Sequence, residues 1–146
     1  MTVGPTGLVV LDTVVVVHLM RGDPTGQAIE KQYALTTRPE RPLLSTVVEG
    51  EMLGLARVWR WGERKVAELQ ALLAQLVRVD AGKREIVDAY AELYHEAMRS
   101  GEPCGENDLW IAATARATGA ALFTCDTDFE WMHPDHLTVY YMPETR

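Results

Sequence analysis

Short apolar runs alternate with longer amphipathic segments along this chain, and this alternation restricts the fold more than any other feature. The run Leu8–Leu11 is apolar throughout, which is typical of a strand buried on both faces of a parallel sheet. Strands that alternate with helices predict an α/β fold with a mostly parallel sheet. Four further short strands are predicted, at Pro42–Thr46, Val77–Val79, Ala120–Thr124 and Leu137–Tyr141.

The segments between these strands have the periodicity of helices. The first strand is expected to stop near Asp12, because extending it through Val14–Val17 would bury a carboxylate in mid-strand. The stretch Gly22–Pro24 predicts a turn, and Gly119 is suited to end the last helix. Helices are expected from Asp12 to Met20, at Gln27–Leu35, Val47–Trp59, Glu63–Leu76 and Arg84–Ser100, and from Asn107 to Gly119.

The length of the chain is that of one ordinary domain. A chain of 146 residues is long enough to bury a normal hydrophobic core. Neither an internal repeat nor an interdomain linker is evident in the sequence. Residues 1–146 are therefore predicted to form a single domain, with residues 1–6 and 143–146 as loose ends.

The apolar stretch Leu8–Leu19 does not have the properties of a membrane segment. It is interrupted by Asp12 and His18 and is too short to span a bilayer. No basic region precedes it, so it does not resemble a signal peptide. We therefore expect a cytoplasmic location, in which Cys104 and Cys125 would be reduced thiols.

The charge of the chain is acidic and unevenly distributed. The net charge is −7; residues 1–73 hold eight acids and eight bases, whereas residues 74–146 hold thirteen acids and six bases. An acidic protein is a poor general binder of nucleic acid, and a polyanionic substrate would need divalent metal to offset the acids of the site. A basic run is most often a solvated helix face. One such run is present: Arg57, Arg60, Arg64 and Lys65.

Two carboxylates are predicted to lie on apolar helix faces. Asp108 shares a face with the small apolar residues that follow it, in a helix whose N-cap would be Asn107. Glu51 falls inside the apolar arc of the Val47–Trp59 helix, whereas Glu49 lies near its edge. A buried lone charge is costly, so each acid needs a cation, a proton or hydrogen bonds. The alternatives are an ordinary cap for Asp108 and a Glu51 side chain that reaches solvent.

Three more carboxylates follow predicted strands. Asp12 ends the first strand, and Asp126 and Asp128 come directly after the fourth. In open α/β sheets, ligands bind beyond the carboxyl ends of the strands, where Glu51 and Asp108 can also point. Clustered carboxylates raise one another's pKa unless a cation lies between them. Oxygen ligands suit Mg²⁺ or Mn²⁺, and the chemistry these ions favour here is phosphodiester hydrolysis.

Four motifs of the chain resemble, in order and spacing, those of PIN-domain proteins, and most nearly the VapC-like toxin branch. Together they cover nearly the whole chain; each is weak alone, but the ordered set is fairly specific. The motifs are Leu11-Asp12-Thr13, Ser45 followed six positions later by Glu51, Asn107-Asp108 leading into Ile111–Ala115, and Thr124-Cys-Asp126-Thr-Asp128-Phe129.

This resemblance implies a fold and an activity. The implied fold is a PIN-like three-layer α/β/α sandwich with a mostly parallel central sheet. The implied activity is Mg²⁺- or Mn²⁺-dependent endonucleolytic cleavage of RNA, by the toxin of a type II toxin–antitoxin pair. A small antitoxin partner and a homodimer are also implied, and four tryptophans with several apolar helices leave apolar surface to be covered.

The resemblance also selects site residues. Thr13 and Thr124, beside the acids, would be secondary contacts to metal-bound water or phosphate, although a structural hydrogen bond is an equal alternative. The matching acids, which would act in catalysis and bind the metal, are Asp12, Glu51, Asp108 and Asp126, with Asp128 as an accessory metal ligand.

One position departs from the family pattern. Family members often read Asp-Thr-Asn, whereas this chain reads Asp12-Thr13-Val14. A polar side chain at the third position can help to hold the first Asp or a water, and valine cannot. The alternative function is therefore a PIN-fold binding module with weak or no nuclease activity.

Other residues admit competing interpretations. Asp126 and Asp128 could open a phosphatase motif of the haloacid dehalogenase type, but Glu130 and the late position in the chain argue against it. The stretch His133–His136 could supply metal ligands, but a surface loop is favoured because no further ligand is near. Packing is favoured over RNA stacking for the four tryptophans, which are Trp59, Trp61, Trp110 and Trp131.

Overall fold

A parallel sheet lies at the centre of the computed structural model, which describes residues 7–102 and 104–145. The strands found in these residues are β1 (Val9–Leu11), β2 (Leu43–Ser45), β3 (Val77–Val79), β4 (Ala121–Thr124) and β5 (Val139–Tyr141). Their spatial order is β3-β2-β1-β4-β5, and every neighbouring pair is parallel. The predicted α/β class is confirmed, and the sheet is parallel throughout.

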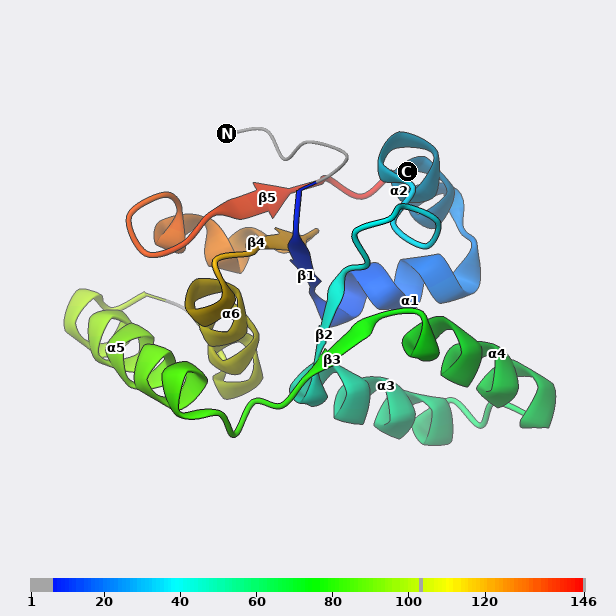
Figure 1. Ribbon diagram of the computed structural model, residues 1–146, viewed down its shortest axis with the longest axis horizontal. Coiled ribbons are helices and arrows are strands. Elements are labelled where there is room, and N and C mark those ends of the chain that lie inside the picture. Colours follow the sequence, from blue (N-terminus) through cyan, green and yellow to red (C-terminus); the bar gives the residue numbers. More distant parts are fainter. Residues whose placement is uncertain (1–6, 103, 146) are drawn as a thin grey trace.

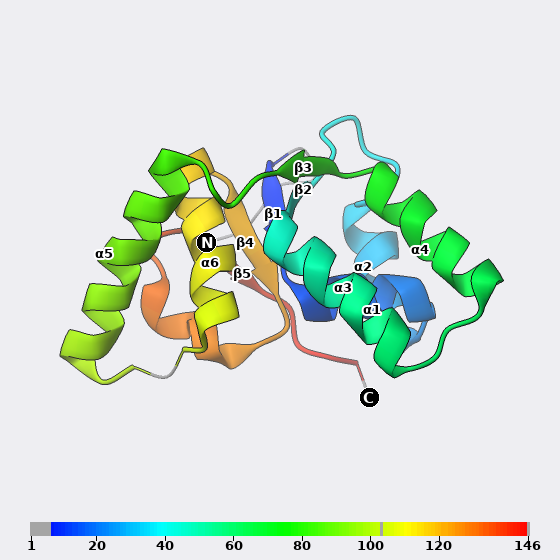
Figure 2. The same cartoon turned by 90° about the horizontal axis from the view of Figure 1, so that it is seen from below.

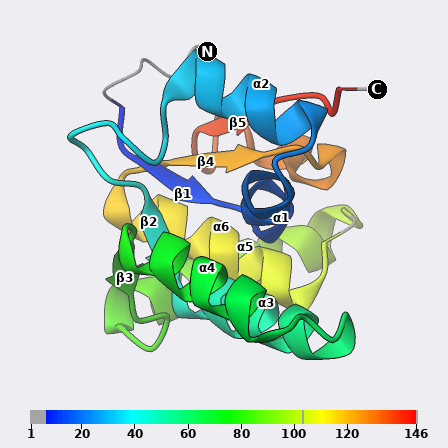
Figure 3. The same ribbon diagram turned by 90° about the vertical axis from the view of Figure 1, so that its right-hand side faces the viewer.

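Helices cover both faces of this sheet. In Figure 3, α2 lies on one side of β1 and β4, and α3, α4, α5 and α6 lie on the other, so the architecture has three layers (Figures 1 and 3). The helices are α1 (Thr13–Arg21), α2 (Pro24–Tyr33), α3 (Thr46–Val58), α4 (Glu63–Ala74), α5 (Arg84–Ser100), α6 (Glu106–Thr118) and the short 3₁₀ helix η1 (Thr127–Met132).

The central strand β1 is buried on both faces, as its uninterrupted apolar run predicts. The strand β3 stands at the edge, and its Val77 and Arg78 are exposed. On the α2 side, the ring of Tyr33 packs edge-on against Phe123 and Tyr140, with centroid separations of 5.1 and 5.2 Å. These aromatic contacts attach α2 to β4 and β5.

The strand order reverses between β1 and β4. The chain passes from β1 to β2 and β3 on one side, and returns on the other side of β1 to form β4 and β5. Leu11 of β1 pairs with Phe123 of β4. The residues that follow these two strands therefore lie next to each other at the topological switch point, where open α/β sheets bind their ligands.

Two helix starts differ from the sequence prediction. Helix α2 begins at Pro24, because Pro suits the first helical position and the Asp23 carboxylate accepts a hydrogen bond from Gly26 N at 2.9 Å. The predicted N-cap Asn107 is wrong: α6 is capped by Gly105, whose backbone is extended, and Asn107 is already helical. The helix η1, which follows β4, was not predicted at all.

The C-terminal segment, expected to be loose, is held against the first two helices. The Oε2 atom of Glu144 lies 2.7 Å from Nε2 of the buried His18, and Thr145 N donates to Thr25 Oγ1 at 2.8 Å. Arg146 and the other expected loose end, residues 1–6, lie outside the described residues. Among the residues that are described, no helix is long and apolar enough to cross a membrane.

Candidate active site

Asp12 is a buried carboxylate at the end of the central strand. Only 4% of the residue is exposed, and it forms the N-cap of α1. Its Oδ1 accepts a hydrogen bond from Thr13 N at 2.8 Å, and its Oδ2 accepts one from Thr124 Oγ1 at 2.7 Å. Burial nevertheless raises the pKa of Asp12, and the nearby charges of Asp126 and Glu51 raise it further.

The hydroxyl of Thr124 joins the acids that follow β1 and β4. It donates to Asp12 and accepts a hydrogen bond from Asp126 N at 2.9 Å. The carboxylate of Asp126 in turn accepts from Asp128 N at 2.9 Å, which starts η1. Thr124 is completely buried, so its two bonds fix the backbone of Asp126 relative to the Asp12 side chain.

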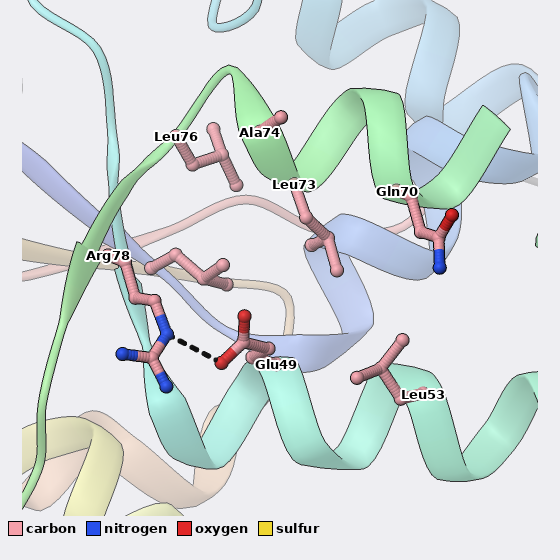
Figure 4. A pocket seen from close by; sticks show the side chains of 8 residues that line it. Glu49, Leu53, Gln70, Leu73, Ala74, Leu76 and Arg78 are labelled. Atoms are coloured by element: carbon pink, nitrogen blue, oxygen red, sulfur yellow. Dashed lines mark hydrogen bonds and ion pairs between the residues drawn. The ribbon is translucent and has the colours of Figure 1, made fainter. Parts of the chain in front are cut away.

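Glu51 faces the same region, and Glu49 does not. Thr13 Oγ1 donates to Glu51 Oε1 at 2.8 Å, which ties α3 to the start of α1. Glu49 instead accepts from Arg78 Nε on the edge strand, at 2.9 Å (Figure 4). The structure therefore places Glu51 beside Asp12 and turns Glu49 away from it, as the helical wheel indicates.

Asp108 lies in the first turn of α6 and lines an open hollow. The hollow has a volume of about 370 Å³ and is lined by Gly105, Glu106, Asn107 and Asp108. Partial burial raises the pKa of Asp108 to about 6, and the charges of the other acids add to this effect. Those acids are, in decreasing order of effect, Asp12, Asp126, Glu51 and Asp128. The five carboxylates thus act on one another electrostatically.

The donor set of this acidic site has the chemistry of a divalent-cation site. Every candidate donor is a carboxylate oxygen, the ligand type that Mg²⁺ and Mn²⁺ prefer, and the pKa of Asp108 is raised first by burial and then by the charges of these acids. Among the described residues, no group of three or more His, Cys, Asp or Glu side chains converges closely enough to enclose a metal. Asp12 and Glu51 are instead occupied by threonine hydroxyls.

Two cysteines flank the acids, and the sequence analysis did not connect them with the site. Burial raises the pKa of the Cys104 thiol to about 12, and Asp108 is the acid that contributes most. Burial raises the pKa of Cys125 to about 11. The positions of Cys125 between Thr124 and Asp126, and of Cys104 four residues before Asp108, were the available signals.

Val14, the residue that departs from the family pattern, lies at the rim of the acidic site. It is 37% exposed and lines a second hollow of about 350 Å³. Asp126 lines the same hollow, so a polar side chain at position 14 could reach toward that acid, whereas the isopropyl group cannot hydrogen-bond. The other lining residues are Cys125, Thr127, Tyr141 and Glu144.

The histidines and Trp110, which were considered as alternative functional residues, make contacts within the fold. His133 Nδ1 accepts a hydrogen bond from Val139 N at 3.0 Å, and His136 rests edge-on against Trp131. Trp110 stacks on Tyr90 with a centroid separation of 4.0 Å, which packs α6 against α5. The packing of Trp110 is as predicted, and the stretch His133–His136 forms a turn whose residues Pro134 and Asp135 are exposed, as predicted for a surface loop.

Sequence comparison agrees with this geometry. A family model described as the PIN domain matches residues 9–132. This chain belongs to the PIN-domain family. The matched span contains all five acids of the site.

The resemblance of this PIN domain to the VapC-like branch is confirmed by individual relatives. It is 27% identical to Ribonuclease VapC1 of Haemophilus influenzae (strain R2866) over 128 residues, which cover 83% of this chain and 93% of that protein. Its fold matches that of VapBC2 from Rickettsia felis, which was solved bound to a DNA fragment from its promoter. The TM-score is 0.78 at 23% identity, and the match covers 92% of this chain and 98% of that one.

A second solved structure supports the same fold for this PIN domain. It is VapBC-5 from Mycobacterium tuberculosis, a member of the VapBC family of toxin–antitoxin systems. The TM-score is 0.68 at 22% identity, over 93% of this chain and 99% of that one. The predicted PIN-like sandwich is thereby confirmed.

Proposed function

We propose that this PIN domain is the toxin of a toxin–antitoxin pair and cleaves RNA endonucleolytically with Mg²⁺ or Mn²⁺. The observation that carries the proposal is the electrostatic coupling of five carboxylates around the switch point of the sheet, where burial and the neighbouring acids raise the pKa of Asp108 to about 6. The likeness to a VapC ribonuclease supports the reaction, because that relative spans nearly the whole chain.

Each acid has a proposed role. Asp12, Asp108 and Asp126 would hold the metal, with Glu51 and Asp128 completing its surroundings. The bound ion would polarise the phosphoryl oxygen and promote ionisation of the attacking water. Thr124 keeps the Asp12 carboxylate in one orientation, and Thr13 does the same for Glu51. The two threonines are thus positioning residues rather than ligands.

The first test replaces single acids. We expect Asp12→Asn and Asp108→Asn to abolish metal-dependent cleavage of single-stranded RNA, while thermal stability holds or rises because like-charge crowding is relieved. Glu49→Gln is the matched control, since it lies on the same helix as Glu51 but pairs with Arg78, and it should keep full activity. Full activity in either Asn variant would refute the site assignment, and loss of folding would indicate a structural role.

Metal binding can be tested without activity. A ligand that binds only the folded state raises its stability by RT ln(1 + [L]/Kd). We expect the unfolding temperature of the wild-type protein to rise with added Mg²⁺ or Mn²⁺, and that of Asp108→Asn to rise much less. An equal rise in both proteins would show that the ion binds elsewhere.

Val14 is the observation that keeps a second function open. Its apolar side chain at the rim of the site cannot help to hold Asp126 or a water. A PIN-fold binding module with little or no cleavage is therefore the alternative. RNA bound by the wild-type protein but left intact at saturating metal would favour this alternative over the nuclease.

An antitoxin is the proposed partner. Without metal, the acids form a region of strongly negative potential that a cationic peptide could occupy. Arginine suits it best, because its planar fork pairs bidentately with carboxylates. We propose that an arginine of a small antitoxin binds at Asp12, Asp108 and Asp126 and blocks cleavage.

Inhibition by this route predicts that other ions compete with the antitoxin for the acids of the site. Binding of the antitoxin should weaken at high salt and at raised Mg²⁺, because both act on the same charges. The test is co-expression with the product of a neighbouring small reading frame, followed by co-purification and an RNA cleavage assay. A complex that cleaves RNA as fast as the free chain would show that the partner acts elsewhere.

A further inference from the structure

The residues where α1 and α3 end and α4 begins include several cationic and aromatic ones, and these helix ends lie on the right-hand side of the ribbon in Figure 2. We call this group the basic–aromatic patch and define it as Arg21, Arg57, Trp59, Arg60, Trp61 and Lys65. The nine residues 57–65 contain four bases and one acid, Glu63, in a chain whose net charge is −7. Trp59 is 39% exposed, and the three arginines are exposed.

Two of the four cations of the patch rest on indole rings rather than on carboxylates. The guanidinium of Arg21 lies 4.9 Å from the centroid of the Trp59 ring, and Lys65 Nζ lies 4.4 Å from that of Trp61. In the described part of the chain, none of the four cations of the patch makes an ion pair. The indole rings therefore hold the charges of Arg21 and Lys65 in place, and all four charges are left available to an anion.

Arg60 occupies a backbone position that favours glycine. Its φ is +55°, and it ends α3 with the paired hydrogen bonds Arg60 N to Arg57 O and Trp61 N to Ala56 O. This is the Schellman arrangement, in which the residue at positive φ is usually glycine. A non-glycine residue there costs about 1 to 2 kcal/mol. Arg60 therefore stands at a position where the backbone itself favours glycine.

A hollow of about 510 Å³ adjoins the patch, which is large enough for a nucleotide-sized group. Arg57 and Arg60 line it together with the indole of Trp61, so two guanidinium groups and one aromatic ring border a single opening. The remaining lining residues are Leu53, Ala56, Val66 and Gln70.

The patch is separate from the acidic site but within reach of one ligand. Trp59 follows Glu51 by eight residues along α3, a distance of about 12 Å at the rise of an α-helix. The screening length at physiological salt is about 8 Å, so the acids do little to cancel the attraction of the patch for an anion. A flexible polyanion could contact both sites at once.

We propose that the basic–aromatic patch is a binding site for single-stranded RNA and holds the substrate beside the acidic site; this rests on the proposed function. Guanidinium forks pair with phosphates, and exposed indoles stack on bases, a combination that binds single strands with little sequence preference. An acidic peptide would use the cations but would have less use for the aromatic rings.

The test measures binding of a fluorescein-labelled oligouridine RNA in buffer with EDTA, so that no cleavage occurs. We expect Arg60→Gly to weaken binding about five-fold while the unfolding temperature stays level or rises, because the strained position receives its preferred residue. Arg60→Gly with Lys65→Ala should weaken it about ten-fold or more. The slope of log affinity against log salt should fall in magnitude by about 0.7 for each cation removed.

Arg84→Ala is the matched control, since it removes an equal charge that is exposed and paired with Asp88 on α5. It should leave RNA affinity nearly unchanged. The proposal would be overturned if the control and the patch variants lost RNA affinity equally, or if the patch variants kept the affinity of the wild type. It would also be overturned if the wild-type protein showed no measurable RNA binding at low salt. Loss of antitoxin binding without loss of RNA binding would assign the patch to a protein partner and also overturn it.

Cleavage is measured separately, with metal added to the wild-type protein. Loss of RNA affinity in the patch variants together with an inactive wild-type chain would uphold the RNA site and reject the nuclease. A wild-type chain that cleaves RNA, together with patch variants whose RNA affinity is unchanged, would uphold the nuclease and reject the RNA site at the patch. The two proposals can therefore fail independently.

Discussion

The carboxyl of Asp108 should make the stability of the fold depend on pH. Its pKa is about 6 in the folded chain, against an ordinary value of 3.8 for an aspartate exposed to water. Between these pH values the folded state binds more protons than the unfolded state, so the free energy of unfolding falls as pH rises from about 4 to about 6 and levels off above. Asp12, whose pKa is also raised, acts in the same direction.

We expect Asp108→Asn to flatten this fall by about 1 kcal/mol, a figure reduced because Asp108 is only half-buried and solvent screens its charge. Urea denaturation of variant and wild type across this pH range, without metal, measures the difference. Glu49→Gln should leave the pH dependence as it is. A profile for Asp108→Asn parallel to that of the wild type would contradict the raised pKa.

A second effect at the residue scale concerns Val14. Replacing it by Asn restores a polar side chain at the rim beside Asp126, and the exposed position should tolerate it at little cost in stability. We expect Val14→Asn to raise the metal-dependent cleavage rate by up to about ten-fold, the lower range of outer-sphere effects at metal sites. An unchanged rate at saturating metal would show that position 14 does not limit activity.

At the scale of elements, close packing of α1 against α2 depends on one glycine. A Cβ atom at Gly26 would lie 2.1 Å from the carbonyl oxygen of His18, which is backbone and cannot move aside cheaply. We expect Gly26→Ala to lower the free energy of unfolding by about 2 to 4 kcal/mol. Chemical denaturation monitored by circular dichroism measures this.

The matched control is Gly50→Ala, in α3. No heavy atom lies within 4 Å of a Cβ built at Gly50, so alanine should stabilise the helix by about 0.5 to 1 kcal/mol. If Gly26→Ala stabilises the protein as Gly50→Ala does, helix propensity rather than the α1–α2 contact governs Gly26.

At the scale of the whole molecule, apolar side chains of α5 remain uncovered. Tyr94 is 44% exposed and Met98 is 64% exposed. We propose that this face pairs two copies of the chain, because apolar surface of this kind is usually buried in an interface. Light scattering at micromolar concentration should give the mass of a dimer, and Met98→Glu should shift it toward a monomer. A monomer mass for the wild-type protein would refute this proposal.

The sequence alone determined which segments are strands and α-helices, although not the short helix η1, since burial leaves a local period of apolar residues. The boundaries of β3 and α5 match the prediction residue for residue. The wheel of α3 also separated Glu51 from Glu49, because one helix turn shows which side faces the core. Asn107 failed as a predicted cap because extended Gly105 opens α6 without any side-chain bond.

Only the tertiary structure decided which of these elements meet. The pairing of Leu11 with Phe123, and the Thr124 hydroxyl that joins Asp12 to Asp126, link residues more than a hundred positions apart. The same holds for Glu144 on His18, and Arg21 on Trp59 is a further contact between separate elements. Local periodicity carries no information about such partners, because they are selected by how the helices pack on the sheet.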